Sequence, residues 1–445
     1  MRASRRSSNR CANVSSSQQF PTPATGALLA SHRRLVVAAV IGNLLEWYDF
    51  FVYGVLAVTI AKLFFPAQSE LTSLLLTLVS YGSGVVVRPF GAIMLGLYAD
   101  RVGRKAALCL ALATMGLGTG LIAIAPTFEA IGIAAPLIIV VARLLQGFSG
   151  SGELGSSVAL LVEAAPDRWR GLYASFNEVS SQIGFLLAAF IVMIINLAMT
   201  PAQIDAGGWR VPFVFGLLVV PIGIYMRSKL EEPAVLSATR DDRTATKAAG
   251  KSGAGRPLLF AVGILLLYAI AGNVLFVYMP TFAVHELKIP TAQALFSSVA
   301  ATCVMILCTP VVAFASDHFG RKPLFLLAAA GFLMLTYPAY AILTNRPSAA
   351  SLAAVQAGLA VLMAVYAGPL KAALAELFPR RIRVTGVGFA YSLTAMIGSF
   401  APAFATWLIA ETANARAPAF IVMVAGVASG LALVWFKDEY GESLV

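Results

Sequence analysis

The sequence GLYADRVGRK at residues 96–105 decides the fold, because its second part, DRVGRK (100–105), returns as DHFGRK at residues 317–322. A second pair of segments, EAAPDRWR at 163–170 and ELFPRRIR at 376–383, is separated by nearly the same distance along the chain. Two repeats at one separation indicate an internal duplication. Long apolar runs flank the repeated segments. The sequence therefore predicts two related halves, each made of apolar segments joined by short charged loops.

The composition indicates the solvent around these apolar segments. Of the 445 residues, 59% are hydrophobic and 12% are charged, whereas about a quarter of the residues of a soluble domain are charged. Apolar runs of about eighteen residues or more recur, and each can cross a hydrocarbon layer of roughly 30 Å. The net charge of +11 is spread in short clusters between these runs, which argues against a nucleic-acid-binding face. The chain is therefore predicted to lie in a lipid bilayer.

Hydropathy predicts twelve membrane-spanning helices, because backbone groups that face lipid must bond within their own segment. The predicted spans lie near 35–61, 72–98, 107–125, 134–160, 172–198, 210–227, 257–283, 294–315, 323–343, 351–373, 385–410 and 418–436. The longest polar break divides them six and six. We therefore predict an all-α membrane protein of twelve transmembrane helices in two pseudo-symmetric six-helix bundles.

The predicted domain organisation follows from these spans. It comprises a disordered cytoplasmic tail (1–34), a first six-helix bundle (35–228), a cytoplasmic linker (229–256), a second six-helix bundle (257–436) and a short cytoplasmic tail (437–445). Residues 1–34 lack the apolar stretch of a cleaved secretory signal. Two other readings of this segment stay open: a start codon assigned too far upstream, or an organelle transit peptide.

The Lys and Arg residues predict the orientation. One set of alternating loops, together with the linker and tails, carries most of them. The other set carries only Lys62, Arg210, Lys288, Arg346 and Arg416. Basic loops favour the cytoplasmic side. We expect a multi-pass protein of the cell inner (plasma) membrane with both termini cytoplasmic.

The repeated loop resembles that of the major facilitator superfamily, in which GxxxDRxGRK joins the second and third helices and a weaker copy joins the eighth and ninth. Gly103 would permit a tight turn, and Asp100 could face the positive end of a neighbouring helix or an Arg across the bundle interface. A basic loop kept only for topology is the alternative. The predicted gating residues are Gly96, Asp100, Arg101, Gly103, Arg104, Lys105, Glu163, Arg170, Asp317, Gly320, Arg321, Lys322, Glu376 and Arg383.

Six further stretches resemble the metabolite:proton symporters of that superfamily. They are GNLLEWYDF (42–50), RPFGA (88–92), RLLQGFS (143–149), GWRVPF (208–213), ALAELFP (373–379) and FAYSL (389–393). The loops are most similar to those of citrate and tricarballylate proton symporters. This resemblance implies proton-coupled symport of a small organic anion, such as citrate or a related carboxylate, by alternating access. The alternatives are symport of 2-oxoglutarate, shikimate or proline/betaine, an efflux antiporter, or a uniporter.

Ionisable side chains inside the predicted spans are candidate site residues, since each costs about 2.5–3.5 kcal/mol at mid-bilayer unless it has a partner or a purpose. They are Glu46, Asp49, Arg88, Arg143, Glu153, Glu178 and Lys371. Glu46 and Asp49 share one helix face, where two close carboxylates raise each other's proton affinity. We predict proton coupling at Glu46, Asp49 and Glu153, although all three could instead be paired structural groups.

Cationic and polar side chains form the predicted substrate site, because guanidinium matches carboxylate in a two-point fashion. The predicted substrate-binding residues are Asn43, Tyr53, Arg88, Arg143, Gln146, Tyr366 and Lys371. Structural ion pairs for the two Arg residues, packing for the Tyr residues and a snorkelling Lys371 are the alternatives. Lys371 and Glu178 both depart from the citrate-type pattern, and the extra negative charge of Glu178 weakens the tricarboxylate assignment.

The motifs of enzymes and ATP-driven proteins do not occur in the sequence. HELKI at 285–289 lacks the second His of HExxH, and neither GxSxG nor GxxxxGK[ST] is present. Cys11, Cys109, Cys303 and Cys308 have no CxxC spacing, so no metal site is predicted. We expect a non-enzyme without cofactor or ATP, a functional monomer whose partners are a small organic acid, protons and the lipid bilayer.

Overall fold

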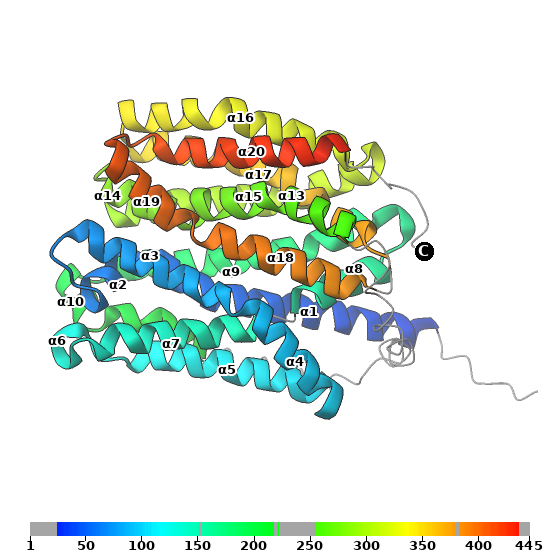
Figure 1. Ribbon diagram of the computed structural model, residues 1–445, viewed down its shortest axis with the longest axis horizontal. Coiled ribbons are helices and arrows are strands. Elements are labelled where there is room, and N and C mark those ends of the chain that lie inside the picture. The colour runs from blue at the N-terminus through cyan, green and yellow to red at the C-terminus, as the bar shows by residue number, and fades with distance from the viewer. Residues whose placement is uncertain are drawn as a thin grey trace, which may run out of the picture.

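The computed structural model describes residues 25–102, 104–150, 153–217, 221, 255–379 and 382–435. Residues 1–24 of the predicted tail, most of the linker, residues 437–445 and Gly103 lie outside these ranges. The structure also leaves several predicted site residues without a described side chain, namely Gly96, Asp100, Arg104, Lys105, Glu153 and Glu163. Within the described residues every regular element is a helix, and the long helices run side by side along one axis (Figure 1).

The first half of the chain forms the elements up to η2. They are α1 (Thr25–Val55), α2 (Ala57–Phe64), α3 (Glu70–Val86), α4 (Arg88–Val102), α5 (Arg104–Ile124), α6 (Phe128–Ile131), α7 (Ala134–Ser149), α8 (Glu153–Ala164), η1 (Asp167–Trp169), α9 (Arg170–Ala198), α10 (Pro201–Ala206) and η2 (Gly208–Arg210). Residues 211–217 continue as a helix and start the predicted sixth span.

The second half contains the remaining elements. They are α13 (Gly255–Gly272), the π-helical η4 (Asn273–Val277), α14 (Met279–His285), α15 (Thr291–Phe319), α16 (Lys322–Asn345), α17 (Ala349–Leu377), α18 (Arg383–Ser399), α19 (Ala401–Thr412) and α20 (Ala417–Trp435).

The helices match the predicted spans in order but differ from them at several ends. Helix α1 begins at Thr25, so residues 25–34, expected in a disordered tail, are helical. The first span is broken at Leu56, where Val40–Val55 and Ala57–Phe64 meet at 62°. The second span is interrupted at Val87, two residues before Pro89, whose ring and missing N–H disturb the helical hydrogen bonds.

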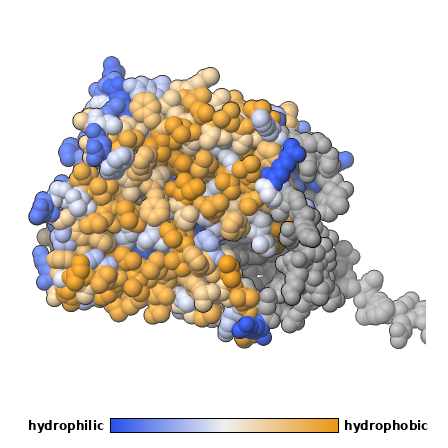
Figure 2. Space-filling model, in the orientation of Figure 1, coloured by the Kyte–Doolittle hydropathy of each residue, from blue (hydrophilic) through white to orange (hydrophobic). Residues whose placement is uncertain are grey.

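The described helices fit a membrane. Eight are long and apolar enough to cross a bilayer, the bent first pair makes a ninth, and Cys109–Ile124 and Ala134–Ser149 are shorter apolar helices. Large apolar side chains such as Leu307 (72% exposed) and Val424 (68% exposed) face outward. Figure 2 shows apolar residues covering the middle of the molecule, with hydrophilic residues gathered at its left end. Lipid is the solvent that such a surface requires.

The two halves pack as bundles that meet along two seams. In the first bundle α1 packs on α9, and α7 packs on α3 and α5; in the second, α13 packs on α18, and α15 packs on α17. Between the bundles, α9 contacts α15, and α3 contacts α18 and α19. The first seam joins the fifth and eighth spans and the other joins the second and eleventh, so the duplication relates one seam to the other.

Within the first bundle, α3 and α7 meet backbone to backbone. A Cβ atom added to Gly147 would lie 1.5 Å from the carbonyl oxygen of Gly84. No side chain fits between these two helices at this point, so both positions require glycine.

Candidate functional site

A cavity lies between the bundles. Its walls contain eight aromatic side chains from both halves, namely Trp47, Phe50, Phe51, Tyr81, Phe185, Tyr268, Phe276 and Tyr391. Of the described residues that line it, Arg88 is the charged one, and Gln182 and Asn273 provide amides. Such a cavity suits a small molecule with an apolar body and few polar groups.

Arg88 and Glu46 form a buried ion pair at this cavity. Nη2 of Arg88 lies 3.7 Å from Oε1 of Glu46, and both side chains are at most 10% exposed. The guanidinium also lies over the rings of Trp47 and Phe50, at 5.4 and 5.1 Å. Arg88 is the first residue of α4 and directly follows the break in the second span. This break turns the side chain of Arg88 toward the cavity. The two residues that sequence reasoning assigned to substrate and proton are therefore neighbours.

Arg143 is enclosed within the first bundle. Its Nη1 donates to Oε1 of Gln146 at 2.9 Å, and its Nη2 donates to the carbonyl of Tyr81 at 3.2 Å. The rings of Phe50, Tyr53 and Tyr81 lie 4.5 to 5.1 Å from the guanidinium carbon. These contacts neutralise no charge, and the described residues place no carboxylate within ion-pair distance of Arg143.

Asp49 is connected to Arg143 by a chain of hydrogen bonds. The hydroxyl of Thr119 donates to Oδ2 of Asp49 at 3.2 Å, and Nε2 of Gln146 donates to Thr119 Oγ1 at 2.9 Å. The other oxygen of Asp49 has no hydrogen-bond partner in the part of the chain that the structure describes, and the residue is 2% exposed. Among the described residues no Lys or Arg pairs with this carboxylate. Asp49 is thus a buried acid in a largely apolar site.

A second buried ion pair joins the two bundles. Nζ of Lys371, in α17, lies 3.6 Å from Oε2 of Glu178, in α9. Glu178 also accepts hydrogen bonds from the hydroxyl of Tyr268 (2.6 Å) and from Nε2 of Gln182 (2.9 Å). The ammonium group lies over the rings of Tyr268 and Tyr391, at 4.9 and 4.7 Å. The two residues that depart from the citrate-type pattern are therefore partners.

Three other predicted substrate residues lie away from the cavity lining. Asn43 donates to the hydroxyls of Ser180 (2.7 Å) and Ser181 (2.8 Å), which ties α1 to α9. Tyr366 donates to the carbonyl of Ile264 at 2.6 Å within the second bundle. Tyr53 packs beside Arg143. Their assignment to substrate stays a prediction.

Sequence reasoning missed Thr119, Gln182 and Tyr268, although each contacts a charged site residue. Thr119 and Gln182 are polar residues within apolar spans. A polar residue within an apolar span can be recognised in the sequence, but the sequence does not show which neighbour its side chain contacts.

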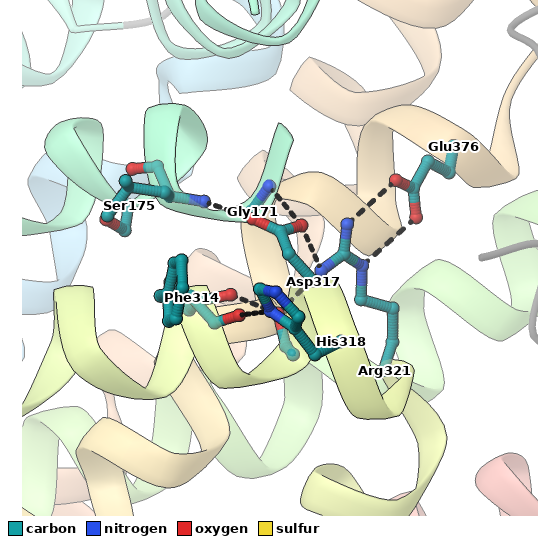
Figure 3. A network of polar contacts seen from close by, with 10 residues as sticks. Gly171, Ser175, Phe314, Asp317, His318, Arg321 and Glu376 are labelled. Atoms are coloured by element: carbon teal, nitrogen blue, oxygen red, sulfur yellow. Dashed lines mark hydrogen bonds and ion pairs between the residues drawn. The ribbon is translucent and has the colours of Figure 1, made fainter. Parts of the chain in front are cut away.

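Three predicted gating residues of the second half, Asp317, Arg321 and Glu376, form a network at the end of the bundles where α15 meets α16, here called the Asp317 end (Figure 3). Asp317 accepts hydrogen bonds from the backbone N–H groups of Gly171 (2.8 Å) and Leu172 (2.9 Å), at the start of α9. Arg321 pairs with Asp317 at 2.7 Å and with Glu376 at 3.1 Å. Burial alone lowers the pKa of Arg321, but Glu376 and Asp317 outweigh it and raise that pKa above its ordinary value.

For the first copy of the repeated loop, we expected Asp100 to face the positive end of a neighbouring helix or an Arg across the bundle interface, and this stays a prediction. The second copy supplies that contact through Asp317. Gly320 supports the turn with a φ of 88°, a conformation that glycine adopts readily.

Arg383 and Lys322 are two further predicted gating residues of the second half. Nε of Arg383 donates to the carbonyl of Ala375 at 2.8 Å, and Nζ of Lys322 donates to the carbonyl of Val434 at 3.1 Å. Arg170 is buried at the start of α9, whereas Arg101 is exposed.

Two helical bundles that span a bilayer and enclose an ionisable cavity define a membrane transporter of the secondary type. The family profile described as Sugar (and other) transporter matches residues 35–253 and 237–439, so the chain belongs to that family. The fold resembles that of the major facilitator superfamily proton:xylose symporter XylE, with a TM-score of 0.75 at 18% identity, covering 94% of this chain and 98% of that one. The expected fold class is confirmed.

Two relatives illustrate the range of the family. The chain is 35% identical over 393 residues to the citrate-proton symporter of Klebsiella pneumoniae, covering 88% of each protein. It is 30% identical over 424 residues to the proline/betaine transporter of Escherichia coli K12, covering 93% of this chain and 85% of the relative. The expected membership among proton symporters of metabolites is confirmed.

Proposed function

We propose that this protein is a secondary active transporter that carries a small organic acid together with protons, by alternating access of its two bundles. The observation that carries the proposal is the buried carboxylate of Asp49, joined to Arg143 through Thr119 and Gln146. A charged carboxylate without a cation is costly in this setting, and a protonated one is not. Asp49 is therefore suited to bind and release a proton.

The hydrogen-bond chain links the protonation state of Asp49 to the shape of the substrate site. Protonation of Asp49 weakens the hydrogen bond from Thr119, which in turn alters the bonds of Gln146 and Arg143. Arg143 holds Phe50 and Tyr81, and both rings line the cavity. Proton binding and the shape of the cavity are thereby coupled.

Arg88 is the proposed anchor for the substrate carboxylate. A bound carboxylate would replace Glu46 as its partner, and the proton held by Asp49 would offset the negative charge that the substrate brings, which keeps the closed site close to neutral. The names of the relatives make citrate or a related carboxylate the first candidate and proline or betaine the second. Each of these molecules presents at least one carboxylate to Arg88.

The Asp317 end is the proposed cytoplasmic gate. The basic loops predict that this end faces the cytoplasm and that both termini lie on the cytoplasmic side. The membrane is then the cell inner (plasma) membrane. Opening toward the cytoplasm would require Asp317 to leave Gly171 and Leu172. We further propose a functional monomer driven by the proton gradient instead of by ATP.

Transport into liposomes tests the proposal. With an inward proton gradient, we expect one labelled acid among citrate, tricarballylate, 2-oxoglutarate, shikimate and betaine to accumulate, and a protonophore to abolish the accumulation. Asp49→Asn should lose this gradient-driven accumulation, whereas Asp205→Asn, at the far end of the bundle, should keep it. Uptake indifferent to the gradient in the unaltered protein would contradict proton coupling.

A further inference from the structure

We propose that Glu178 is a specificity-determining residue, which cancels the charge of Lys371 and thereby restricts the site to organic acids with a single negative charge. The inference rests on the proposed function, since it concerns the substrate of the same cavity. It narrows the candidates named there to acids with one negative charge and so removes fully ionised citrate from them. It is carried by the position of the Glu178–Lys371 pair directly behind the cavity wall.

The wall between this pair and the cavity consists of side chains that line the cavity and also contact the pair. Tyr268, Gln182 and Tyr391 line the cavity, and each contacts Glu178 or Lys371. Both charged side chains are at most 1% exposed. Lys371 is therefore one layer away from a bound ligand, but its charge is already compensated from the opposite bundle.

The described charges around the cavity balance. Among the residues whose side chains the structure describes there, three are cations (Arg88, Arg143 and Lys371) and three are carboxylates (Glu46, Asp49 and Glu178), so their sum is zero when all are ionised. Asp49 is the carboxylate without a cation partner, and we expect it to bind one proton. One proton and one substrate charge leave the loaded site neutral, whereas a trianion would need two further protons and the loss of both ion pairs.

Access to the three cations agrees with this balance. Arg88 reaches the cavity, but Arg143 is enclosed by three rings and bonded to Gln146 and to Tyr81, and Lys371 is held by Glu178. A tricarboxylate therefore meets a single accessible guanidinium among eight aromatic side chains. Such walls favour the apolar body of a monocarboxylate over a second or third carboxylate.

A matched series of ligands tests the proposal. Butyrate, glutarate and tricarballylate carry one, two and three carboxylates on the same three-carbon chain. Their affinities for the purified protein can be measured by thermal stabilisation at mildly alkaline pH, where the carboxyl groups are ionised. We expect the wild-type protein to bind butyrate about tenfold tighter than tricarballylate. Glu178→Gln should free Lys371, so that glutarate binds at least about tenfold tighter relative to butyrate than before.

Two further variants keep the test decisive. Glu178→Gln combined with Lys371→Met removes both charges and should restore the wild-type order, even if the single variant folds poorly. Glu129→Gln, at an exposed position, should leave the order unchanged. A wild-type protein that prefers tricarballylate, or an unchanged order in a folded Glu178→Gln protein, would overturn the inference but leave proton symport intact. Binding of none of the three acids would overturn both the inference and the organic-acid assignment.

Discussion

The backbone N–H of Gly171, in the first bundle, donates a 2.8 Å hydrogen bond to Oδ1 of Asp317, in the second. A Cβ atom at Gly171 would lie 2.8 Å from the same carboxylate oxygen and 2.7 Å from Nη1 of Arg321. Glycine at this position therefore lets the carboxylate reach the first turn of α9, where unpaired backbone N–H groups and the positive end of the helix favour an anion. One carboxylate thus fastens the two bundles at the Asp317 end.

Asp317→Asn should loosen this end. The substitution removes the charge that pairs with Arg321 and weakens two hydrogen bonds to backbone N–H groups, each worth about 1.5–3 kcal/mol when the acceptor is charged. We expect the amides of Gly171 and Leu172 to exchange with deuterium at least about tenfold faster. Hydrogen–deuterium exchange followed by mass spectrometry measures this, with Asp205→Asn as the control. Equal exchange in both variants would show that Asp317 does not fasten α9.

Thr119→Val should uncouple transport from the proton gradient. Valine has nearly the shape of threonine but cannot bond to Asp49 or Gln146, and each lost bond is worth about 1 kcal/mol. We expect gradient-driven accumulation to fall about tenfold, while exchange of substrate between equal pH values continues. Thr119→Ser retains the hydroxyl and should behave like the wild-type protein. If the valine variant accumulated substrate as well as the serine variant, the chain from Asp49 to Arg143 would have no part in coupling.

Gly147→Ala should destabilise the first bundle. The added methyl group would overlap the carbonyl oxygen of Gly84, and overpacking of this kind costs about 1–3 kcal/mol, occasionally more. Gly358→Ala is the matched control, because its Cβ would meet nothing within 4 Å. Thermal unfolding in detergent compares the two, and we expect a clearly lower Tm for Gly147→Ala alone.

Removal of one partner of the Glu178–Lys371 pair should cost more stability than removal of both. A single substitution leaves a buried charge alone, at about 3–5 kcal/mol, whereas an uncharged pair avoids that penalty. The unfolding free energies of Glu178→Gln, Lys371→Met and the double variant form a cycle that measures the coupling. The exposed pair of Lys62 and Asp205 supplies the comparison, since its coupling should be at most about 1 kcal/mol. Additive costs at Glu178 and Lys371 would contradict the ion pair.

Much of the fold could be predicted because membranes impose strong rules. Apolar run length defines the spans, and a duplicated loop defines the two halves. The breaks at Leu56 and in η4 escaped prediction, since a bent or π-helical segment inside an apolar run does not change its hydropathy. The start of α1 at Thr25 was not predicted, because the sequence of a polar helix outside the bilayer is similar to that of a disordered tail.

The sequence predicted which residues belong to the candidate site better than it predicted which of them contact each other. Charges inside spans pointed to Arg88, Arg143 and Lys371, but a sequence does not say which side chain of a distant helix each one meets. Glu178 and Lys371 are far apart in the chain, and the departure of each from the citrate-type pattern did not identify them as partners. The aromatic lining was hidden for another reason: aromatic residues are common in every apolar helix.

The contact between Gly84 and Gly147 has a consequence for the energetics of the cycle. Because α3 and α7 touch backbone to backbone at this point, we expect these two helices to change their tilt together as one block. We then expect the layer of rings and ion pairs between the two bundles to contribute to the activation barrier between the two orientations. The temperature dependence of turnover would accordingly report on that layer, and a bilayer of different thickness would alter the rate by tilting a rigid body instead of by bending its helices.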